Sequence, residues 1–262
     1  MLNSLKKKLA VPLYRLYERR LAGRLDHSQF PLHIGIIMDG HRRYARAARL
    51  ETYADSYRTG MRTLEEVISW TDEFGIPSIT AWVLSTENLK RPAEEIEPYF
   101  DVLIELFGRL PRLALRHDFQ LNVIGSLDPL PDRLVTAAKQ AMEEASVGSR
   151  LVTIAMGYGG RQEIVDACRD LVDELAEDGV SAAEMAERID ALGIASHLYS
   201  PNQPDADLVI RTSGESRLSG FLMWQSAYAE YAFVDVFWPA FRRVDFLRAL
   251  RDYAAAERRF GQ

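Results

Sequence analysis

The sequence predicts a single α/β domain built on a central, mostly parallel six-stranded sheet that is flanked by helices. Two observations predict this fold. Six short, β-branched runs are almost continuously apolar, which is expected of strands that are buried on both faces. Longer segments with apolar residues at helical spacing separate these runs, and such alternation is typical of parallel α/β sheets.

Each element can be placed along the chain. We expect strands at 33–39, 78–85, 119–125, 151–158, 206–212 and 231–236, because each run is apolar and bounded by polar or turn residues. We expect helices at 60–74, 93–110, 132–145, 161–178, 181–192 and 244–259, because apolar residues recur there every three or four positions. No repeat or linker divides these elements, so we expect a domain at 31–262 after an N-terminal helical segment at 1–30.

Composition excludes several classes of function. The 32 basic and 38 acidic residues give a net charge of −6, which is unlike a general nucleic-acid-binding protein. The single cysteine, Cys168, excludes an intramolecular disulfide and a cysteine-based zinc site, and it agrees with a reducing compartment. We therefore expect a cytoplasmic protein that binds no nucleic acid.

The N-terminal segment is amphipathic. Leu13, Leu16, Tyr17 and Leu21 recur at helical spacing among basic side chains. Two interpretations remain open: a helix on the protein's own surface, or a helix in peripheral contact with a membrane. The segment lacks the apolar core of a signal peptide, and no stretch reaches the roughly 18 apolar residues that span a bilayer.

Polar residues gather where the predicted strands end. Asp39-Gly40-His41-Arg42-Arg43-Tyr44 follows the first strand, and residues 85–92 follow the second. Residues 157–161 follow the fourth strand and residues 211–217 end the fifth. Ligands of open parallel sheets bind outside the carboxyl ends of the strands, so we expect the site at this edge.

These residue types point to an anion. Gly40 allows close backbone approach, and the turn after it can open a helix whose N–H groups face a phosphate. Arginine side chains match phosphate oxygens with forked donors, and the candidates are Arg43, Arg91, Arg211 and Arg217.

A carboxylate beside phosphates indicates a metal. Asp39 would repel a phosphate unless a cation lay between them, and Mg²⁺ binds one or two carboxylates together with substrate phosphates. Glu230, just before the sixth strand, is the candidate second ligand. Simpler roles remain open: Asp39 as a helix cap, Arg211 and Arg217 in surface ion pairs, and Ser85 and Asn88 as turn residues.

The phosphates are not those of a common nucleotide. The chain has no G-x-x-x-x-G-K-[ST] motif, and Gly157-Tyr158-Gly159-Gly160 does not satisfy G-x-G-x-x-G. These absences disfavour ATP and NAD as ligands.

Four segments carry a family resemblance. Residues 33–46, 84–92, 157–161 and 207–230, together with the terminal Arg259-Phe260-Gly261, resemble the cis-prenyltransferase family of the undecaprenyl diphosphate synthase type. The resemblance extends from about residue 30 to the end of the chain. It is strongest to short-chain actinobacterial members, which make Z,E-farnesyl diphosphate.

The resemblance implies an activity and the residues that carry it. It implies an Mg²⁺-dependent, head-to-tail condensation of isopentenyl diphosphate with an allylic diphosphate to a short Z-prenyl diphosphate of farnesyl length. Asp39 would hold Mg²⁺, Asn88 would accept or relay a proton, and Glu230 would be the second metal contact. The substrate contacts would be Gly40, His41, Arg42, Arg43, Tyr44, Tyr57, Ser85, Thr86, Glu87, Leu89, Arg91, Arg211, Arg217, Leu218 and Ser219.

The resemblance also implies a homodimer. The ending Arg259-Phe260-Gly261 matches an R-x-G motif that reaches across the dimer interface in relatives. Two other classes of function remain open, a non-catalytic partner subunit and an unrelated phosphate-binding module. The retained Asp39 and its arginines favour the enzyme over both.

Three positions depart from the family pattern. Leu89 replaces a frequent Trp, Tyr57 stands where long-chain members often have His, and His41 stands where Asn is usual. His41 leaves three outcomes open: a silent change, turnover that depends on pH between roughly 6 and 8, or head-to-middle coupling to a lavandulyl-type diphosphate. The retained Ser85 and Asn88 favour ordinary head-to-tail coupling.

Bulky residues predict a short product, with a longer-chain polyprenyl diphosphate as the alternative. In relatives the product grows into a tunnel lined by the second strand and neighbouring helices. The residues expected to shorten it here are Trp82, Val83, Leu84, Tyr99, Phe100, Leu103 and Phe107, although each would also suit an ordinary core position.

Overall fold

The computed structural model describes residues 17–256. Its six strands form one sheet in the order β3-β4-β2-β1-β5-β6, and every neighbouring pair is parallel. The predicted α/β sheet is thus confirmed, and it is all-parallel rather than mostly parallel. The strands are β1 His33–Ile37, β2 Ser78–Ser85, β3 Phe119–Ile124, β4 Arg150–Tyr158, β5 Leu208–Thr212 and β6 Glu230–Val234.

The helices differ from expectation at three places. The helix expected from residue 60 begins at Tyr53, because Thr52 caps it by accepting a hydrogen bond from the N–H of Asp55. The segment expected as one helix over 181–192 forms two, since Asp190 caps a second helix. The helix expected over 93–110 ends at Phe107, and a further helix begins at Leu110. The α-helices are α2 His41–Ala48, α3 Tyr53–Glu73, α4 Ala93–Phe107, α5 Leu110–His117, α6 Asp132–Glu144, α7 Gly160–Glu177, α8 Ala182–Arg188, α9 Ala191–Ser196 and α10 Arg243–Ala255; the 3-10 helices are η1 His27–Gln29, η2 Thr86–Lys90 and η3 Trp238–Ala240.

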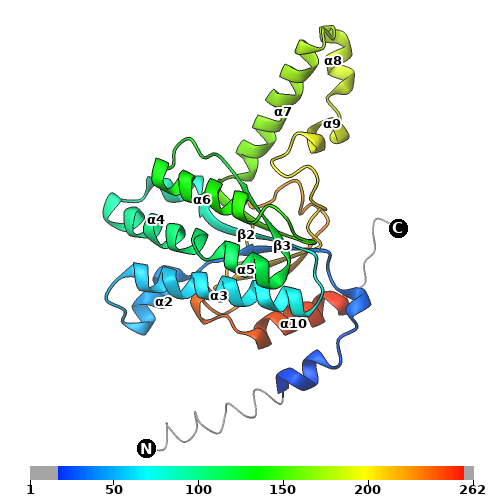
Figure 1. The fold of residues 1–262 in the computed structure, drawn as a ribbon. Coiled ribbons are helices and arrows are strands. Elements are labelled where there is room, and N and C mark those ends of the chain that lie inside the picture. Colours follow the sequence, from blue (N-terminus) through cyan, green and yellow to red (C-terminus); the bar gives the residue numbers. More distant parts are fainter. Residues whose placement is uncertain (1–16, 257–262) are drawn as a thin grey trace, which may run out of the picture.

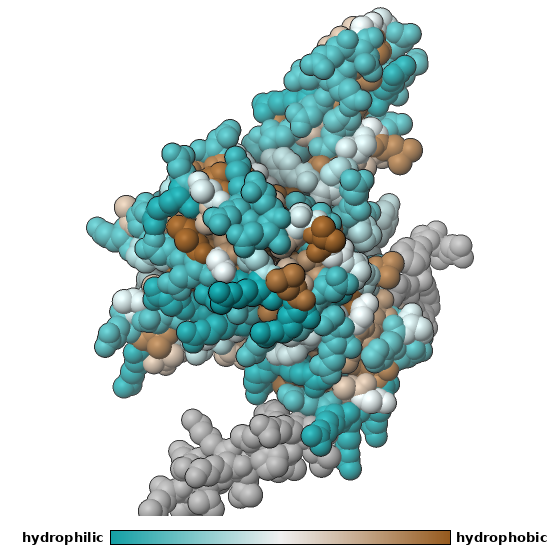
Figure 2. Space-filling view, viewed as in Figure 1, coloured by the Kyte–Doolittle hydropathy of each residue, from teal (hydrophilic) through white to brown (hydrophobic). Residues whose placement is uncertain are grey.

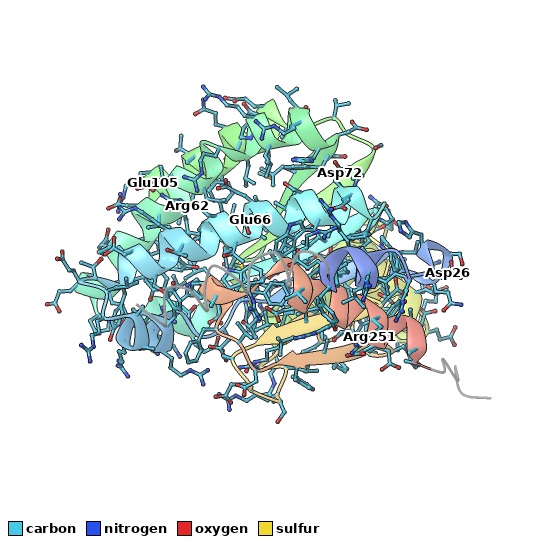
Figure 3. All side chains as sticks on the ribbon, turned by 90° about the horizontal axis from the view of Figure 1, so that it is seen from below. Asp26, Arg62, Glu66, Asp72, Glu105 and Arg251 are labelled. Atoms are coloured by element: carbon cyan, nitrogen blue, oxygen red, sulfur yellow. The ribbon has the colours of Figure 1, made fainter. Side chains whose placement is uncertain are left out.

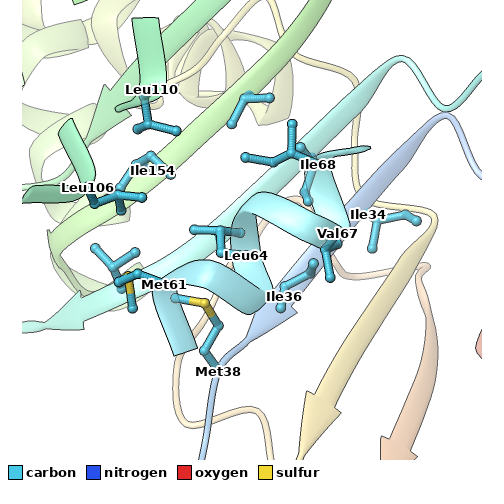
Figure 4. Close-up of a cluster of buried hydrophobic side chains, with 14 of the residues drawn as sticks. Ile34, Ile36, Met38, Met61, Leu64, Val67, Ile68, Leu106, Leu110 and Ile154 are labelled. Atoms are coloured by element: carbon cyan, nitrogen blue, oxygen red, sulfur yellow. The ribbon is translucent and has the colours of Figure 1, made fainter. Parts of the chain in front are cut away.

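The main core lies between one face of the sheet and α3 to α6 with α10. Leu64 and Ile68 of α3 are fully buried, as is Ile34 of β1 (Figure 4). Burial of each such side chain stabilises the fold by about 1.5–3 kcal/mol. Figure 1 shows α7, α8 and α9 projecting away from this body.

A smaller core covers the opposite face of the sheet. Ile37 of β1 and Val209 of β5 pack there against Phe221 and Leu222. Gly35 makes this contact close, because a Cβ at that position would lie 3.0 Å from Cε1 of Phe221. The glycine therefore lets the segment after β5 lie directly on β1.

The described part of the N-terminal helix, residues 17–22, lies on the protein itself. Leu21 is buried in the main core, and the guanidinium of Arg248 lies 5.5 Å from the ring centre of Tyr17. These contacts favour the first of the two interpretations of this segment. Leu13 and Leu16 lie outside the described residues.

The outer surface is largely polar. Figure 2 shows a mainly hydrophilic face with small, separate apolar patches. Figure 3 shows charged side chains of α3 and α4 on the outside, among them Arg62, Glu66 and Glu105. Within residues 17–256, no helix is both long enough and apolar enough to cross a bilayer.

Candidate active site

A cavity of about 580 Å³ opens at the carboxyl edge of the sheet. The ends of β1, β2 and β5 contribute to its lining, together with the start of α2 and the segment 213–219. The structure thus brings most of the predicted site residues together. Those that line the cavity are Asp39, Gly40, His41, Arg42, Arg43, Tyr57, Ser85, Asn88, Arg91, Arg211, Arg217 and Ser219.

Asp39 lies two residues beyond β1, between the ends of β1 and β5. Thr212 holds its backbone, because the Thr212 hydroxyl accepts from the Asp39 N–H at 3.0 Å and donates to the Asp39 carbonyl at 2.8 Å. The carboxylate accepts a hydrogen bond from Arg211 at 2.8 Å. Burial raises the pKa of Asp39, but Arg211 and Arg43 outweigh burial, so the pKa lies below its usual range. The carboxylate is therefore ionised at neutral pH.

Gly40 turns the chain from Asp39 into α2. Its φ of 104° is in the left-handed region, and a Cβ there would lie 2.8 Å from Cδ1 of Phe237. No side chain caps the start of α2, so its first N–H groups are open to a ligand. A helix start of this kind favours an anion.

Arg43 spans the mouth of the cavity. It donates to the Ser213 hydroxyl at 2.6 Å and lies 3.6 Å from Asp39 and 3.4 Å from Glu215. Glu215 also pairs with the exposed Arg217 at 2.7 Å. Both arginines line the cavity and are held by neighbouring acceptors.

Arg211 is the buried cation of the site. It donates to the Ser219 hydroxyl at 2.9 Å and also to the carbonyl of Arg217. The backbone around it is strained, because Ser213, Ser219 and Leu222 have positive φ values of 80°, 54° and 44°. Strained backbone of this kind clusters at ligand-binding segments.

Ser85 and Asn88 begin η2 as a capping box. The Asn88 N–H donates to the Ser85 hydroxyl at 3.2 Å, and the Ser85 N–H donates to the Asn88 side-chain oxygen at 3.4 Å. Ser85 and Asn88 are therefore turn residues, as one interpretation expected, and both also line the cavity.

Arg91, Tyr57 and Glu95 form a polar group beside the start of α4. Arg91 donates to the Tyr57 hydroxyl at 3.1 Å, and that hydroxyl donates to Glu95 at 3.2 Å. Burial raises the pKa of Tyr57 to about 12, so Tyr57 is neutral and is both donor and acceptor.

His41 is packed against α3. Its Nδ1 lies 3.4 Å from the Ser56 carbonyl, and its ring centre lies 5.2 Å from that of Tyr57. Burial lowers the pKa of His41 to about 4, with Arg91 acting in the same direction. The imidazole is thus neutral in the free protein.

Side chains from both faces of the sheet line the cavity. Trp82, Ile37 and Arg211 occupy the same row of neighbouring strands, so their side chains leave the same face. Val83 and Tyr99 belong instead to the main core on the other face. Trp82 and Val83 nevertheless line the same cavity, one from each face of the sheet.

Glu230 lies away from the other predicted residues. It begins β6 and pairs with Leu208 at the start of β5, so it lies at the amino edge of the sheet. Asp39 follows β1 at the carboxyl edge. Within one chain, the structure does not bring Glu230 to Asp39. Five other predicted contacts also fall outside the cavity lining: Tyr44, Thr86, Glu87, Leu89 and Leu218.

Sequence reasoning missed some cavity residues. Glu215 lines the cavity and pairs with Arg43, and its position directly after β5 was a usable signal. Ser213, also after β5, accepts a hydrogen bond from Arg43 although it does not line the cavity itself. Met38 and Arg46 also line the cavity, next to motif residues on β1 and α2. Nothing in the sequence around Met38 and Arg46 marked them as site residues.

The donor set fits Mg²⁺ when a diphosphate is bound. Asp39 supplies one ionised carboxylate, and a magnesium ion takes one or two carboxylates plus phosphate oxygens and water. Among residues 17–256, no cluster of three or more acidic, His or Cys side chains forms a cage for a metal alone. A metal at Asp39 would therefore need oxygens from the substrate.

The family profile described as putative undecaprenyl diphosphate synthase matches residues 37–261. The chain belongs to this prenyltransferase family. Isoprenyl transferase 1 of Streptomyces avermitilis is 48% identical over 98% of this chain and 99% of the relative. The (2Z,6E)-farnesyl diphosphate synthase of Thermobifida fusca is 49% identical over 97% of this chain and 98% of the relative.

Solved structures agree with the family assignment. Lavandulyl diphosphate synthase from Lavandula x intermedia, in complex with dimethylallyl diphosphate, matches with a TM-score of 0.84 and 30% identity over 90% of this prenyltransferase and 100% of that chain. A probable undecaprenyl diphosphate synthase from Campylobacter jejuni matches with a TM-score of 0.71 and 26% identity over 88% and 99% of the two chains.

These comparisons decide between the classes of function. The predicted family and the prediction of an enzyme that transfers prenyl groups are both confirmed. The interpretation as an unrelated phosphate-binding module is wrong, because the family match covers the strand ends that form the cavity.

Proposed function

We propose that this prenyltransferase condenses isopentenyl diphosphate head-to-tail with an allylic diphosphate and releases a short Z-prenyl diphosphate of farnesyl length. The observation that carries the proposal is the arrangement of two anion-binding groups on either side of one ionised carboxylate. The first group is Gly40, Arg43 and the start of α2, and the second is Arg211, Arg217 and Ser219. Asp39 lies between them.

Each group would hold one diphosphate. The allylic diphosphate lies against the open start of α2, and isopentenyl diphosphate lies against Arg211 and Ser219. The allylic C1–O bond breaks and its electron pair leaves with the diphosphate, while the π pair of the C3=C4 bond of isopentenyl diphosphate forms the new C1–C4 bond. Loss of a C2 proton to an oxygen of the departed diphosphate, relayed by Asn88 and Ser85, restores a double bond.

Asp39 and the arginines would stabilise the leaving group. A bound Mg²⁺ would supply charge neutralisation to the departing diphosphate. Asp39 would hold that ion at the junction of the two groups, and Arg43 would add forked hydrogen bonds to the phosphate oxygens. Donors fixed before the reaction need little reorganisation when charge develops.

The apolar half of the cavity supports a short product. Tyr99 packs against Tyr57 with ring centres 4.3 Å apart and planes tilted by 38°, and the Tyr99 hydroxyl donates to the carbonyl of Val83. This contact joins α3, α4 and β2 beside the cavity. Relatives named as farnesyl-length and short-chain Z-isoprenyl diphosphate synthases, at 43–49% identity, support the same product class.

We also infer a cytoplasmic homodimer. The single cysteine and the lack of nucleotide motifs agree with a cytoplasmic enzyme of diphosphate substrates. The dimer rests on the resemblance of Arg259-Phe260-Gly261 to the family motif, and these residues lie outside the described part of the chain.

Head-to-middle coupling is a second candidate. The structural likeness to a lavandulyl diphosphate synthase and the unusual His41 favour it. Ser85 and Asn88, which line the cavity beside Asp39, favour head-to-tail coupling.

One product assay tests the proposal. The purified chain is incubated with Mg²⁺ and labelled isopentenyl diphosphate, with geranyl or dimethylallyl diphosphate as the starter, and products are identified by mass spectrometry and NMR. A linear Z,E-farnesyl skeleton is expected. A branched product from dimethylallyl diphosphate alone, or a C50 chain, would contradict it. His41→Asn run in parallel from pH 6 to 8.5 is expected to give the same linear product.

A further inference from the structure

We propose that the indole of Trp82 stabilises the positive charge that forms on C3 of the isopentenyl group during coupling. The inference rests on the proposed function and adds a catalytic residue to it. Trp82 lines the cavity but forms no part of either anion-binding group.

The strand register places Trp82 on the same face of the sheet as Arg211. Trp82 pairs with Ile37, and Ile37 pairs with Arg211, so the three residues form one row across β2, β1 and β5. Two strand spacings separate the backbones of Trp82 and Arg211 by about 10 Å. The carbon chain of a diphosphate on Arg211 would reach the indole if it extends across Ile37.

The ring of Trp82 is fixed from behind. One face stacks on Phe221, with ring centres 5.2 Å apart and planes 10° apart, and its edge meets Tyr158 at 6.2 Å and 89°. Phe221 in turn lies on Gly35, which has no side chain to keep it away from β1. These contacts leave the opposite face of the indole for the cavity.

The open face of the indole can stabilise a positive charge on the alkene. Arg211 is positively charged and is already paired with Asp39, so it supplies no stabilisation to a cation that forms on C3. An aromatic face attracts a cation through its quadrupole, and Trp does so best among the side chains. The C3 charge exists from formation of the C1–C4 bond until the C2 proton leaves for the diphosphate oxygen, so its stabilisation lowers the barrier to coupling.

Other aromatic residues of the cavity are less well placed. Tyr57 and Tyr99 belong to the main core on the opposite face of the sheet. Phe221 is fully buried behind Trp82. Among the aromatic residues that line the cavity, Trp82 is thus the one on the face of Arg211.

Graded fluorination of Trp82 tests the inference. Mono-, di- and trifluorotryptophan are introduced at this one position of the full-length chain, because fluorine weakens the ring quadrupole while nearly keeping its shape. The single-turnover rate of product formation is expected to fall stepwise, to a total of about tenfold to thirtyfold. The dissociation constant of isopentenyl diphosphate without the allylic substrate is expected to stay within about twofold. Trp82→Leu is expected to lose at least as much rate as the trifluoro form.

Trp70 provides a matched control. It packs against Phe241 and Phe246, away from the cavity, so the same fluorinated residues there are expected to leave the rate unchanged. Equal rates across the Trp82 series would overturn the inference, as would a fall explained entirely by weaker substrate binding. Failure of the unmodified protein to make a head-to-tail product would instead overturn the proposed function, and the inference with it.

Discussion

Arg211 donates to Asp39 at 2.8 Å, and this ion pair joins the ends of β5 and β1 at the centre of the cavity. Arg211 is 4% exposed in its side chain, whereas Asp39 is 32% exposed. The buried arginine thus has a charge partner in the free protein, while the carboxylate keeps a side open to a ligand.

Asp39→Asn tests the pair while keeping the shape of the side chain. We expect a loss of about a thousandfold in turnover, because several kcal/mol of leaving-group stabilisation disappear with the charge. We also expect a loss of stability on the order of 2 kcal/mol, since Arg211 keeps a buried charge without a partner. Incorporation of labelled isopentenyl diphosphate and urea unfolding measure the two effects.

Asp101→Asn is the control, because Asp101 pairs with Arg133 on the exposed surface. It is expected to change turnover and stability little. Turnover of Asp39→Asn equal to that of the unmodified protein would remove the role given to Asp39.

Tyr99→Ala is expected to lengthen the product. The substitution removes the ring that packs against Tyr57 and the hydroxyl that donates to the Val83 carbonyl, so space opens between α4 and β2. Product sizing by mass spectrometry should show chains longer than farnesyl diphosphate. Phe119→Ala, at a buried position on the edge strand β3, separates this effect from general loosening of the core. Identical products from all three proteins would argue against a tunnel at Tyr99.

Gly60→Ala is expected to destabilise the protein through His41. A Cβ at Gly60 would lie 2.2 Å from Cε1 of His41 and 2.8 Å from Cδ1 of Trp238. Overpacking of this kind costs about 1–3 kcal/mol. His41→Ala in the same chain should recover part of that loss, which a double-mutant cycle of urea unfolding measures. Strict additivity of the two substitutions would show that His41 does not restrict this position.

The buried His33 is expected to make the folded protein less stable in mild acid. Burial lowers the pKa of His33 to about 4. The hydrogen bond between its Nδ1 and the Pro204 carbonyl acts in the opposite direction and is the smaller effect. Between about pH 6.5 and 4 the unfolded chain binds the proton and the folded chain does not, so stability falls as the pH falls through this window. The full contribution is about 3 kcal/mol.

Urea unfolding at pH 7 and pH 5 measures this loss. His33→Gln removes the titrating ring and should unfold with a smaller difference between the two pH values. His27→Gln, a substitution at a solvent-exposed histidine of η1, should keep the full difference. Equal pH dependence of His33→Gln and the unmodified protein would contradict the prediction.

The strand ends were predictable because parallel strands present the same edge to a ligand. Asp39, Ser85 and Arg211 follow or end three different strands, and the structure places all three on one cavity. Glu230 shows the limit of this argument. It is adjacent to a strand in sequence but precedes it, and a residue before a parallel strand lies at the opposite edge.

The face of each side chain was harder to predict. Trp82 and Val83 are both bulky and adjacent, and only the register with Ile37 shows which of them shares a face with Arg211. A register shift between Trp82 and Leu84 further disturbs simple alternation. The end of α4 was also missed, because α5 continues the apolar pattern after Gly108 with little change of composition.

The sheet order has a consequence for how the protein is made. β1 lies between β2 and β5, so the residues that meet at the cavity are 172 positions apart in the case of Asp39 and Arg211. A nascent chain that has emerged only as far as β4 has a four-stranded sheet with β1 as an unpaired edge. Such an edge invites pairing with other chains, so synthesis of β5 and then β6 completes the cavity, covers β1 and leaves only the short strand β6 as the edge on that side.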